Sequence, residues 1–113
     1  MLTIQALEEY GANVKEGLQR CMGKEDFYLR LVGMALADGG FAKLGEAIEE
    51  KDYKKGFEAA HALKGILSNL SLTPILDPVV EITELLRAGT ETDYAPLYTT
   101  IMEQYNKLKQ LSE

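Results

Sequence analysis

Apolar residues along the chain recur three or four positions apart, which is the spacing of an α-helix. No stretch alternates apolar and polar residues for long enough to indicate a half-buried strand. The pattern predicts short helices over residues 2–10 and 14–22, and longer helical segments over residues 25–50, 53–72, 78–88 and 94–108. Because the connections are short, neighbouring helices should be antiparallel. The sequence therefore predicts an all-α fold: one domain over residues 1–113, built as an up-down antiparallel four-helix bundle with one or two short additional N-terminal helices.

Capping residues and prolines mark where several of these helices begin. Thr3, Asn13 and Asp52 each stand just before a helical period, where a side-chain oxygen can accept a hydrogen bond from a free backbone N–H. Thr73-Pro74 and Asp77-Pro78 both look like a cap followed by a first-turn proline. The helix after the histidine segment is therefore expected either to begin at Asp77-Pro78 or to be kinked there.

Two further expectations concern buried side chains near the N-terminus. The apolar segment 25–37 should turn one side inward, and Asp38-Gly39-Gly40 should then end or bend that helix. The expected inner residues are Phe27, Tyr28, Leu31, Val32, Met34 and Ala35. Cys21 is the only cysteine, so it cannot form an internal disulfide, and its apolar neighbours predict a buried thiol.

The segment 52–72, DYKKGFEAAHALKGILSNLSL, contains the only histidine of the chain, His61. With about 100° of rotation per residue, the small and apolar residues of this helix gather opposite His61. They are Gly56, Ala59, Leu63, Ile66, Leu67 and Leu70. The residues on the same side as His61 are Lys54, Phe57, Glu58, Lys64, Gly65 and Ser68. We therefore expect His61 to be exposed to solvent.

Composition limits the class of protein without naming it. The 113 residues are 46% hydrophobic and 27% charged, as in ordinary globular domains. The net charge of −6 argues against a nucleic-acid partner or an anionic membrane, since both favour a basic surface. The N-terminus lacks the features of a signal peptide, and no apolar run is long enough to cross a bilayer. With no possible disulfide, the chain is expected to be cytoplasmic.

An exposed imidazole beside a cation and a glycine is suited to phosphoryl transfer. Neutral imidazole is a good nucleophile and leaving group near neutral pH, so it can accept a phosphoryl group and release it again. Lys64, one turn away, could offset the added negative charge. Gly65 removes bulk where a donor or acceptor must approach closely. Ser68 could donate a hydrogen bond, while Glu58 could hold the second ring nitrogen or be simply solvated.

Other interpretations use the same residues. Glu58 and His61 form a Glu-x-x-His pair of the kind that binds di-iron centres, but such a site needs a second histidine. A hydrolytic dyad is disfavoured because Ser68 lies two turns from His61 and no G-x-S-x-G signature is present. Lys64 and Gly65 could also be chance surface residues, although a glycine inside a helix costs about 1 kcal/mol relative to alanine.

The sequence around His61 resembles the signature of a known family. AHALKG at 60–65 looks like the His-x-(Leu/Ile)-Lys-Gly motif of histidine-containing phosphotransfer (HPt) domains. The similarity extends to GLQRCMGKEDFYLRLVGMAL at 17–36, AIEEKDYKKGFEAAHALKG at 47–65 and ITELLRAG at 82–89. At two positions where many members carry glycine or another small residue, this chain has Ser68 and Ser71. An ungapped comparison places Pro78 inside the family's next helix.

The resemblance implies a phosphorelay intermediate that shuttles a phosphoryl group between aspartates of receiver domains. It implies receiver domains or a hybrid sensor histidine kinase as partners, no ATP-dependent kinase activity, and no cofactor, since the receiver holds the Mg²⁺. His61 would be the phosphoacceptor, Lys64 its charge partner and Gly65 the opening for the partner. Residues expected to contact the partner are Phe57, Glu58, Lys54 and Ser68. The alternative is a helical-bundle interaction module that binds a receiver or kinase without transferring phosphate, and a small-molecule enzyme is the weakest option.

Overall fold

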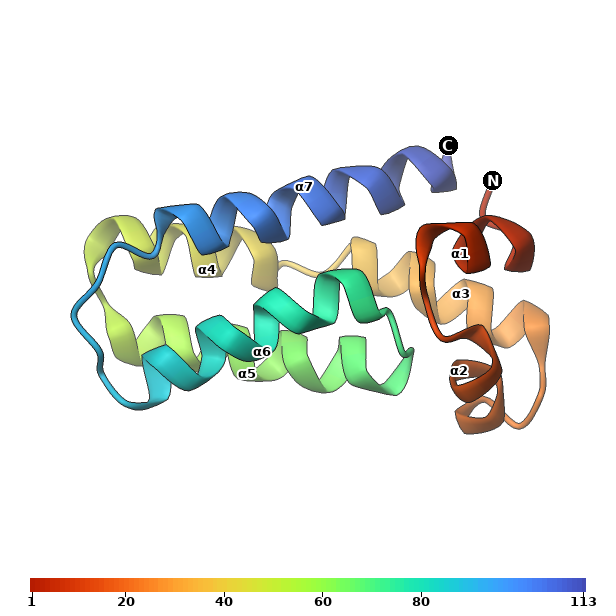
Figure 1. Ribbon diagram of the computed structural model, residues 1–113, viewed down its shortest axis with the longest axis horizontal. Coiled ribbons are helices and arrows are strands. Elements are labelled where there is room, and N and C mark those ends of the chain that lie inside the picture. The colour runs from red at the N-terminus through yellow and green to blue at the C-terminus, as the bar shows by residue number, and fades with distance from the viewer.

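The computed structural model describes the whole chain, residues 1–113, and contains helices and no strands. Its seven helices are α1 (Ile4–Tyr10), α2 (Val14–Arg20), α3 (Glu25–Leu36), α4 (Gly40–Glu50), α5 (Tyr53–Asn69), α6 (Thr73–Arg87) and α7 (Ala95–Ser112). Helices α4 to α7 run alternately back and forth along the molecule, whereas α1 and α2 lie at one end beside α3 (Figure 1). The predicted all-α fold is confirmed, and α1 and α2 are the short N-terminal helices.

The segment 25–50 is divided into two helices. Helix α3 ends at Leu36, and α4 begins at Gly40. In the connection, the Asp38 carboxylate accepts a hydrogen bond of 2.8 Å from the backbone N–H of Gly40. The helical path is therefore interrupted between Leu36 and Gly40 and is not merely bent there.

The three predicted N-terminal caps are confirmed. The Thr3 hydroxyl accepts from the N–H of Ala6 at 3.1 Å, and the Asn13 side chain accepts from the N–H of Glu16 at 3.2 Å. The Asp52 carboxylate accepts from the N–H of Lys55 at 3.1 Å and so starts α5. Each bond satisfies one of the backbone donors that a helix N-terminus leaves free.

The predicted first-turn proline at Thr73-Pro74 is confirmed, whereas the predicted start of the helix at Asp77-Pro78 is wrong. Helix α6 already begins at Thr73, with Pro74 in its first turn and Pro78 inside it. Pro78 has no N–H to donate to the carbonyl of Pro74, so the helix gives up one backbone hydrogen bond. Ile75 and Val79 lie on either side of Asp77-Pro78 and are fully buried, which stabilises helical structure through this turn.

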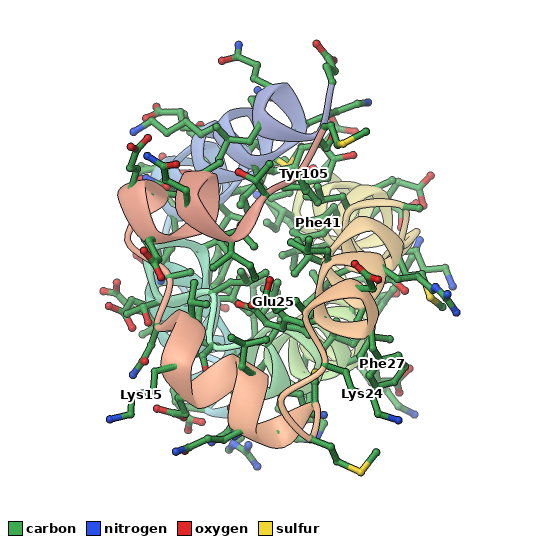
Figure 2. The ribbon with its side chains drawn as sticks, turned by 90° about the vertical axis from the view of Figure 1, so that its right-hand side faces the viewer. Lys15, Lys24, Glu25, Phe27, Phe41 and Tyr105 are labelled. Atoms are coloured by element: carbon green, nitrogen blue, oxygen red, sulfur yellow. The ribbon has the colours of Figure 1, made fainter.

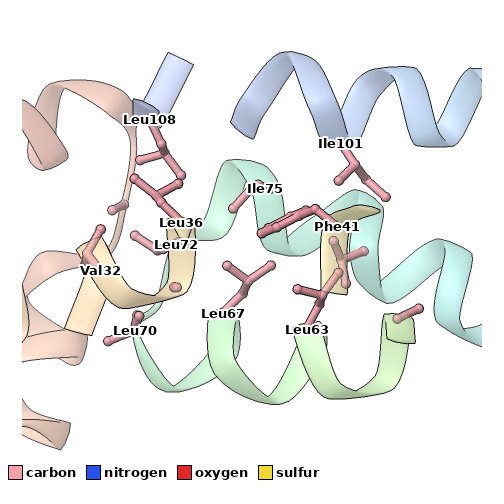
Figure 3. Close-up of a cluster of buried hydrophobic side chains, with 14 of the residues drawn as sticks. Val32, Leu36, Phe41, Leu63, Leu67, Leu70, Leu72, Ile75, Ile101 and Leu108 are labelled. Atoms are coloured by element: carbon pink, nitrogen blue, oxygen red, sulfur yellow. The ribbon is translucent and has the colours of Figure 1, made fainter. Parts of the chain in front are cut away.

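One cluster of 23 buried hydrophobic residues fills the space between the helices. Leu63 and Leu67 of α5 point into it, toward Phe41 and Ile75, and Ile101 of α7 closes it from above (Figure 3). Because the apolar stripe of α5 is buried in this cluster, the opposite face of α5 is left to solvent. A separate prediction is also confirmed, since the Cys21 thiol is buried.

The predicted inner face of α3 is partly wrong. Phe27 is 39% exposed and Met34 is 61% exposed, while Tyr28 and Val32 are fully buried. Phe27 points outward, unlike Phe41, which faces Tyr105 at a ring distance of 4.8 Å (Figure 2). Helix α3 has two adjacent apolar stripes, and the one that contains Tyr28 is the one that packs inward. The sequence pattern alone could not choose between them.

Tyr28 should make the free energy of unfolding depend on pH in the alkaline range. Its hydroxyl donates a hydrogen bond of 2.8 Å to the carbonyl of Leu70, and burial raises the pKa of Tyr28 to about 12. An unfolded tyrosine loses its proton near pH 10, so above that pH the folded state binds more protons and stability falls. Up to about 2–3 kcal/mol should be lost between about pH 10 and 12 through this group.

The Tyr28→Phe variant isolates this effect. Burial also raises the pKa of Tyr94 and Tyr98, so the wild-type protein alone would report several groups. We expect the difference in unfolding free energy between wild type and Tyr28→Phe, measured by urea denaturation, to shrink as the pH rises from about 10 to 12. A difference that stays constant would contradict the assignment.

Candidate functional site

Helix α5 carries the candidate site and is held on both sides. On the α4 side, the Lys55 ammonium lies 3.2 Å from a Glu50 oxygen and 3.3 Å from a Glu46 oxygen. The hydrogen bonds to Glu50 and Glu46 raise the pKa of Lys55. On the opposite, buried side, a Cβ at Gly56 would lie 3.4 Å from Leu86 of α6, an ordinary van der Waals contact, so α5 packs directly on α6 there. The neighbouring helices therefore hold α5 in place and leave its outer face accessible.

His61 lies on this outer face and is exposed, as predicted. Its imidazole stacks on the ring of Phe57, with ring centroids 5.4 Å apart and an interplanar angle of 21°. The guanidinium of Arg87 lies 5.0 Å from the centre of the same Phe57 ring, within the range of a cation–π contact. Phe57 is only half-buried, so it limits the orientation of His61 without covering it.

Lys64 lies one turn beyond His61 and is half-buried. Its ammonium is 3.9 Å from one carboxylate oxygen of Glu84, and the other Glu84 oxygen is 3.3 Å from Arg87 Nε. Both partners belong to α6, so this helix adds an anion and a cation beside the histidine. The sequence analysis did not identify Glu84 or Arg87. The available signal was their spacing of three residues on the helix that follows α5 and runs back beside it in an up-down bundle.

Gly65 lies on the open side of α5. A Cβ added at Gly65 would meet no heavy atom within 4 Å, so packing inside the protein does not require a glycine there. A groove of about 590 Å³ between α5 and α6 begins at this position, and Lys64 and Ser68 also line it. Its far side is formed by Leu76 and Val80 of α6. The space that Gly65 leaves therefore opens toward solvent.

The remaining predicted site residues are distributed around this centre. Glu58 is exposed and makes no hydrogen bond to His61, so the suggestion that it holds the second ring nitrogen is wrong for this structure. It faces the α4 side, in a hollow that Lys43 and Lys55 also line. Lys54 is exposed at the start of α5. Ser68 is half-buried, and its backbone carbonyl accepts a hydrogen bond from Arg20 of α2.

No group of three or more His, Cys, Asp or Glu side chains in the chain is arranged to hold a metal ion. A di-iron centre at Glu58 and His61 therefore has no ligand set. None of the helices combines the length and the apolar character needed to span a bilayer.

The structure is an all-α bundle, and its single histidine, His61, is exposed near the middle of α5. Lys64 and Gly65 lie next to it, and Gly65 is free of packing contacts. The model of the Hpt domain family matches residues 35–111, which run from the end of α3 almost to the end of α7. The match covers more than half of the sequence, and the chain belongs to the Hpt domain family. Comparisons with curated proteins and with solved structures gave no significant match.

Membership of the Hpt domain family defines the general activity of the domain. Hpt domains carry phosphoryl groups on histidine in two-component phosphorelays, as phosphocarriers and not as kinases, and they interact with receiver domains and histidine kinases. The resemblance found in the sequence is thereby confirmed for the family.

Proposed function

We propose that the protein is a phosphorelay intermediate in which His61 accepts a phosphoryl group from an aspartate of one receiver domain and donates it to another. One observation carries this proposal. The only histidine of a chain that belongs to the Hpt family lies exposed on the outer face of a bundle helix, within the matched residues. A histidine with this role has to be reachable by the aspartyl phosphate of a separate protein.

The transfer step uses few groups of this chain. The lone pair of a neutral imidazole nitrogen of His61 attacks the phosphorus, a P–N bond forms, and the P–O bond to the receiver aspartate breaks. The bonding pair stays with the aspartate carboxylate, and the proton stays on the second ring nitrogen, from which water can take it. Lys64 offsets the charge on the phosphoryl oxygens. Mg²⁺ belongs to the receiver in this proposal, and the reverse step passes the group on.

Gly65 and the surrounding outer face form the docking surface in this proposal. The open space at Gly65 lets the partner backbone approach the histidine. Phe57 offers a half-buried aromatic surface beside His61, of a kind that often contributes strongly to binding. Glu58 and Lys54 extend the surface toward the start of α5, and Ser68 extends it along the groove.

Replacement of Lys64 by alanine should slow phosphoryl transfer about tenfold or more, because the ammonium stabilises negative charge in the transition state. The free energy of unfolding should change by less than about 1 kcal/mol, since the ion pair with Glu84 is long and partly exposed. Transfer rates and urea denaturation measure the two quantities. Lys107→Ala, an exposed lysine on α7, is the control and should change neither. A large loss of stability in Lys64→Ala would show a structural role instead.

Transfer from a receiver domain tests the proposed function. A receiver labelled with radioactive phosphate on its aspartate is mixed with wild type or with His61→Gln, and the label on each protein is followed. We expect rapid transfer to wild type and none to His61→Gln. If no receiver of the same organism passes label to wild type while one binds it, the protein is the non-transferring interaction module.

A further inference from the structure

Glu84 of α6 bridges two cations beside the histidine. One of its carboxylate oxygens lies 3.9 Å from Lys64 Nζ, and the other lies 3.3 Å from Arg87 Nε. The same Arg87 guanidinium contacts the Phe57 ring, and that ring stacks on His61. A continuous set of contacts therefore runs from His61 to Lys64 by way of α6.

The contact with Glu84 occupies Lys64, the cation that a phosphoryl group on His61 would need. A phosphoryl group brings a charge of about −1.5 to −2, and the nearest lysine on the same helix face already faces Glu84. At 3.9 Å, the contact is long for an ion pair. The side chains of Lys64 and Glu84 are 29% and 54% exposed, so the pair is weak and easily exchanged.

We propose that Glu84 acts through Lys64 as a competitor of the phosphoryl group: it pairs with Lys64 in the unphosphorylated protein and gives it up to the phosphoryl group on His61. Arg87 is the nearer of the two cations, so it remains with Glu84 after the exchange. The phosphoryl group then does not face an unpaired carboxylate. This inference rests on the proposed function of His61 and adds a determinant of how readily His61 accepts the group.

A small phosphoryl donor tests the role of Glu84 without requiring a receiver domain to dock. The donor is phosphoramidate. The His61 nitrogen attacks its phosphorus, a P–N bond to the imidazole ring forms, and the P–N bond of the donor breaks. The donor nitrogen, which is protonated as –NH3⁺, keeps the bonding pair and leaves as ammonia, and water takes the proton from the second ring nitrogen. The initial rate of phosphohistidine formation is followed by phosphorus NMR. The proteins are wild type, Glu84→Gln, Glu81→Gln, Lys64→Ala and Lys64→Ala/Glu84→Gln.

Glu81→Gln is the matched control, because Glu81 is an exposed glutamate of α6 that makes no ion pair. It changes the net charge by the same unit as Glu84→Gln. We expect Glu84→Gln to raise the initial rate about two- to fivefold, the range of exposed ion pairs, and Glu81→Gln to leave it unchanged. The gain should shrink at high salt and vanish in the Lys64→Ala background.

Three results would overturn the proposed role of Glu84: an equal gain in rate in Glu81→Gln, the same gain in rate with and without Lys64, or a loss of rate in Glu84→Gln. A parallel measurement with a phosphorylated receiver separates this inference from the proposed function. If wild type accepts the group from phosphoramidate and from no receiver, the proposed function fails while the Glu84 comparison is still decided. If receivers transfer normally and Glu84→Gln behaves like Glu81→Gln, only the bridge is wrong.

Discussion

Substitutions at Gly65 are expected to make the protein more stable and a poorer phosphoryl acceptor. A side chain at Gly65 would enter open space, so nothing inside the protein opposes it. Gly65→Ala should therefore raise the free energy of unfolding by about 0.5–1 kcal/mol, the usual gain when alanine replaces glycine inside a helix. The bulkier Gly65→Gln should slow transfer from a receiver about 100-fold, because small displacements of reacting groups are that costly.

The choice of donor separates access from chemistry. Phosphoramidate is small enough to reach His61 past the new side chain, so its rate of transfer to Gly65→Gln should fall far less than that of a receiver. Gly33 is a matched control, because it is an exposed glycine inside α3 with open space at its Cβ position. Gly33→Gln should change stability similarly and leave transfer intact. Normal receiver transfer to Gly65→Gln would show that the glycine has no role in docking.

Leu63→Ala is expected to have the largest effect on stability among substitutions near the motif. Leu63 is 1% exposed and lies inside the central cluster, where it packs on Gly40 at the start of α4. Truncation of a buried leucine to alanine costs about 2–5 kcal/mol, through lost burial and the cavity left behind. Urea denaturation of wild type and variant measures this cost directly.

The adjacent residue provides the control for this prediction. Lys64 is next to Leu63 in sequence but is turned about 100° around the helix, toward the outer face, so Lys64→Ala should change stability little and transfer strongly. At a temperature where Leu63→Ala remains folded, its transfer rate should be close to that of wild type, since Leu63 does not reach the outer face. If Leu63→Ala cost less than about 1 kcal/mol, the orientation assigned to α5 would be wrong.

Helix α5 was predictable because its leucines lie on one side. Leu63 and Leu67 leave a single way to turn the helix toward the core, and this fixes His61 outward. Helix α3 was not predictable in the same way, since Phe27 and Tyr28 begin two competing stripes. The start of α6 was ambiguous for another reason, because Pro78 can stand in a first turn or inside a helix whose neighbouring residues are buried.

The residues of the candidate site were likewise predictable only in part. Lys64 and Gly65 are neighbours of His61 on one helix, so sequence spacing alone brings them together. Glu84 and Arg87 reach the histidine across the contact between α5 and α6. Their position depends on the turn between these helices and on how they cross, neither of which a helical period contains. The position of Glu58 also required the structure, because spacing allowed both a hydrogen bond to His61 and solvation.

Direct localisation of the phosphoryl group tests the central claim about His61 most directly. After transfer from a phosphorylated receiver, the protein is digested under neutral conditions and the modified peptide is identified by mass spectrometry. We expect a single modification at His61 in α5 that is labile in acid, stable in base and absent from His61→Gln. A modification on a carboxylate or hydroxyl side chain, or one that persists in His61→Gln, would contradict the assignment of His61 as the phosphoryl carrier.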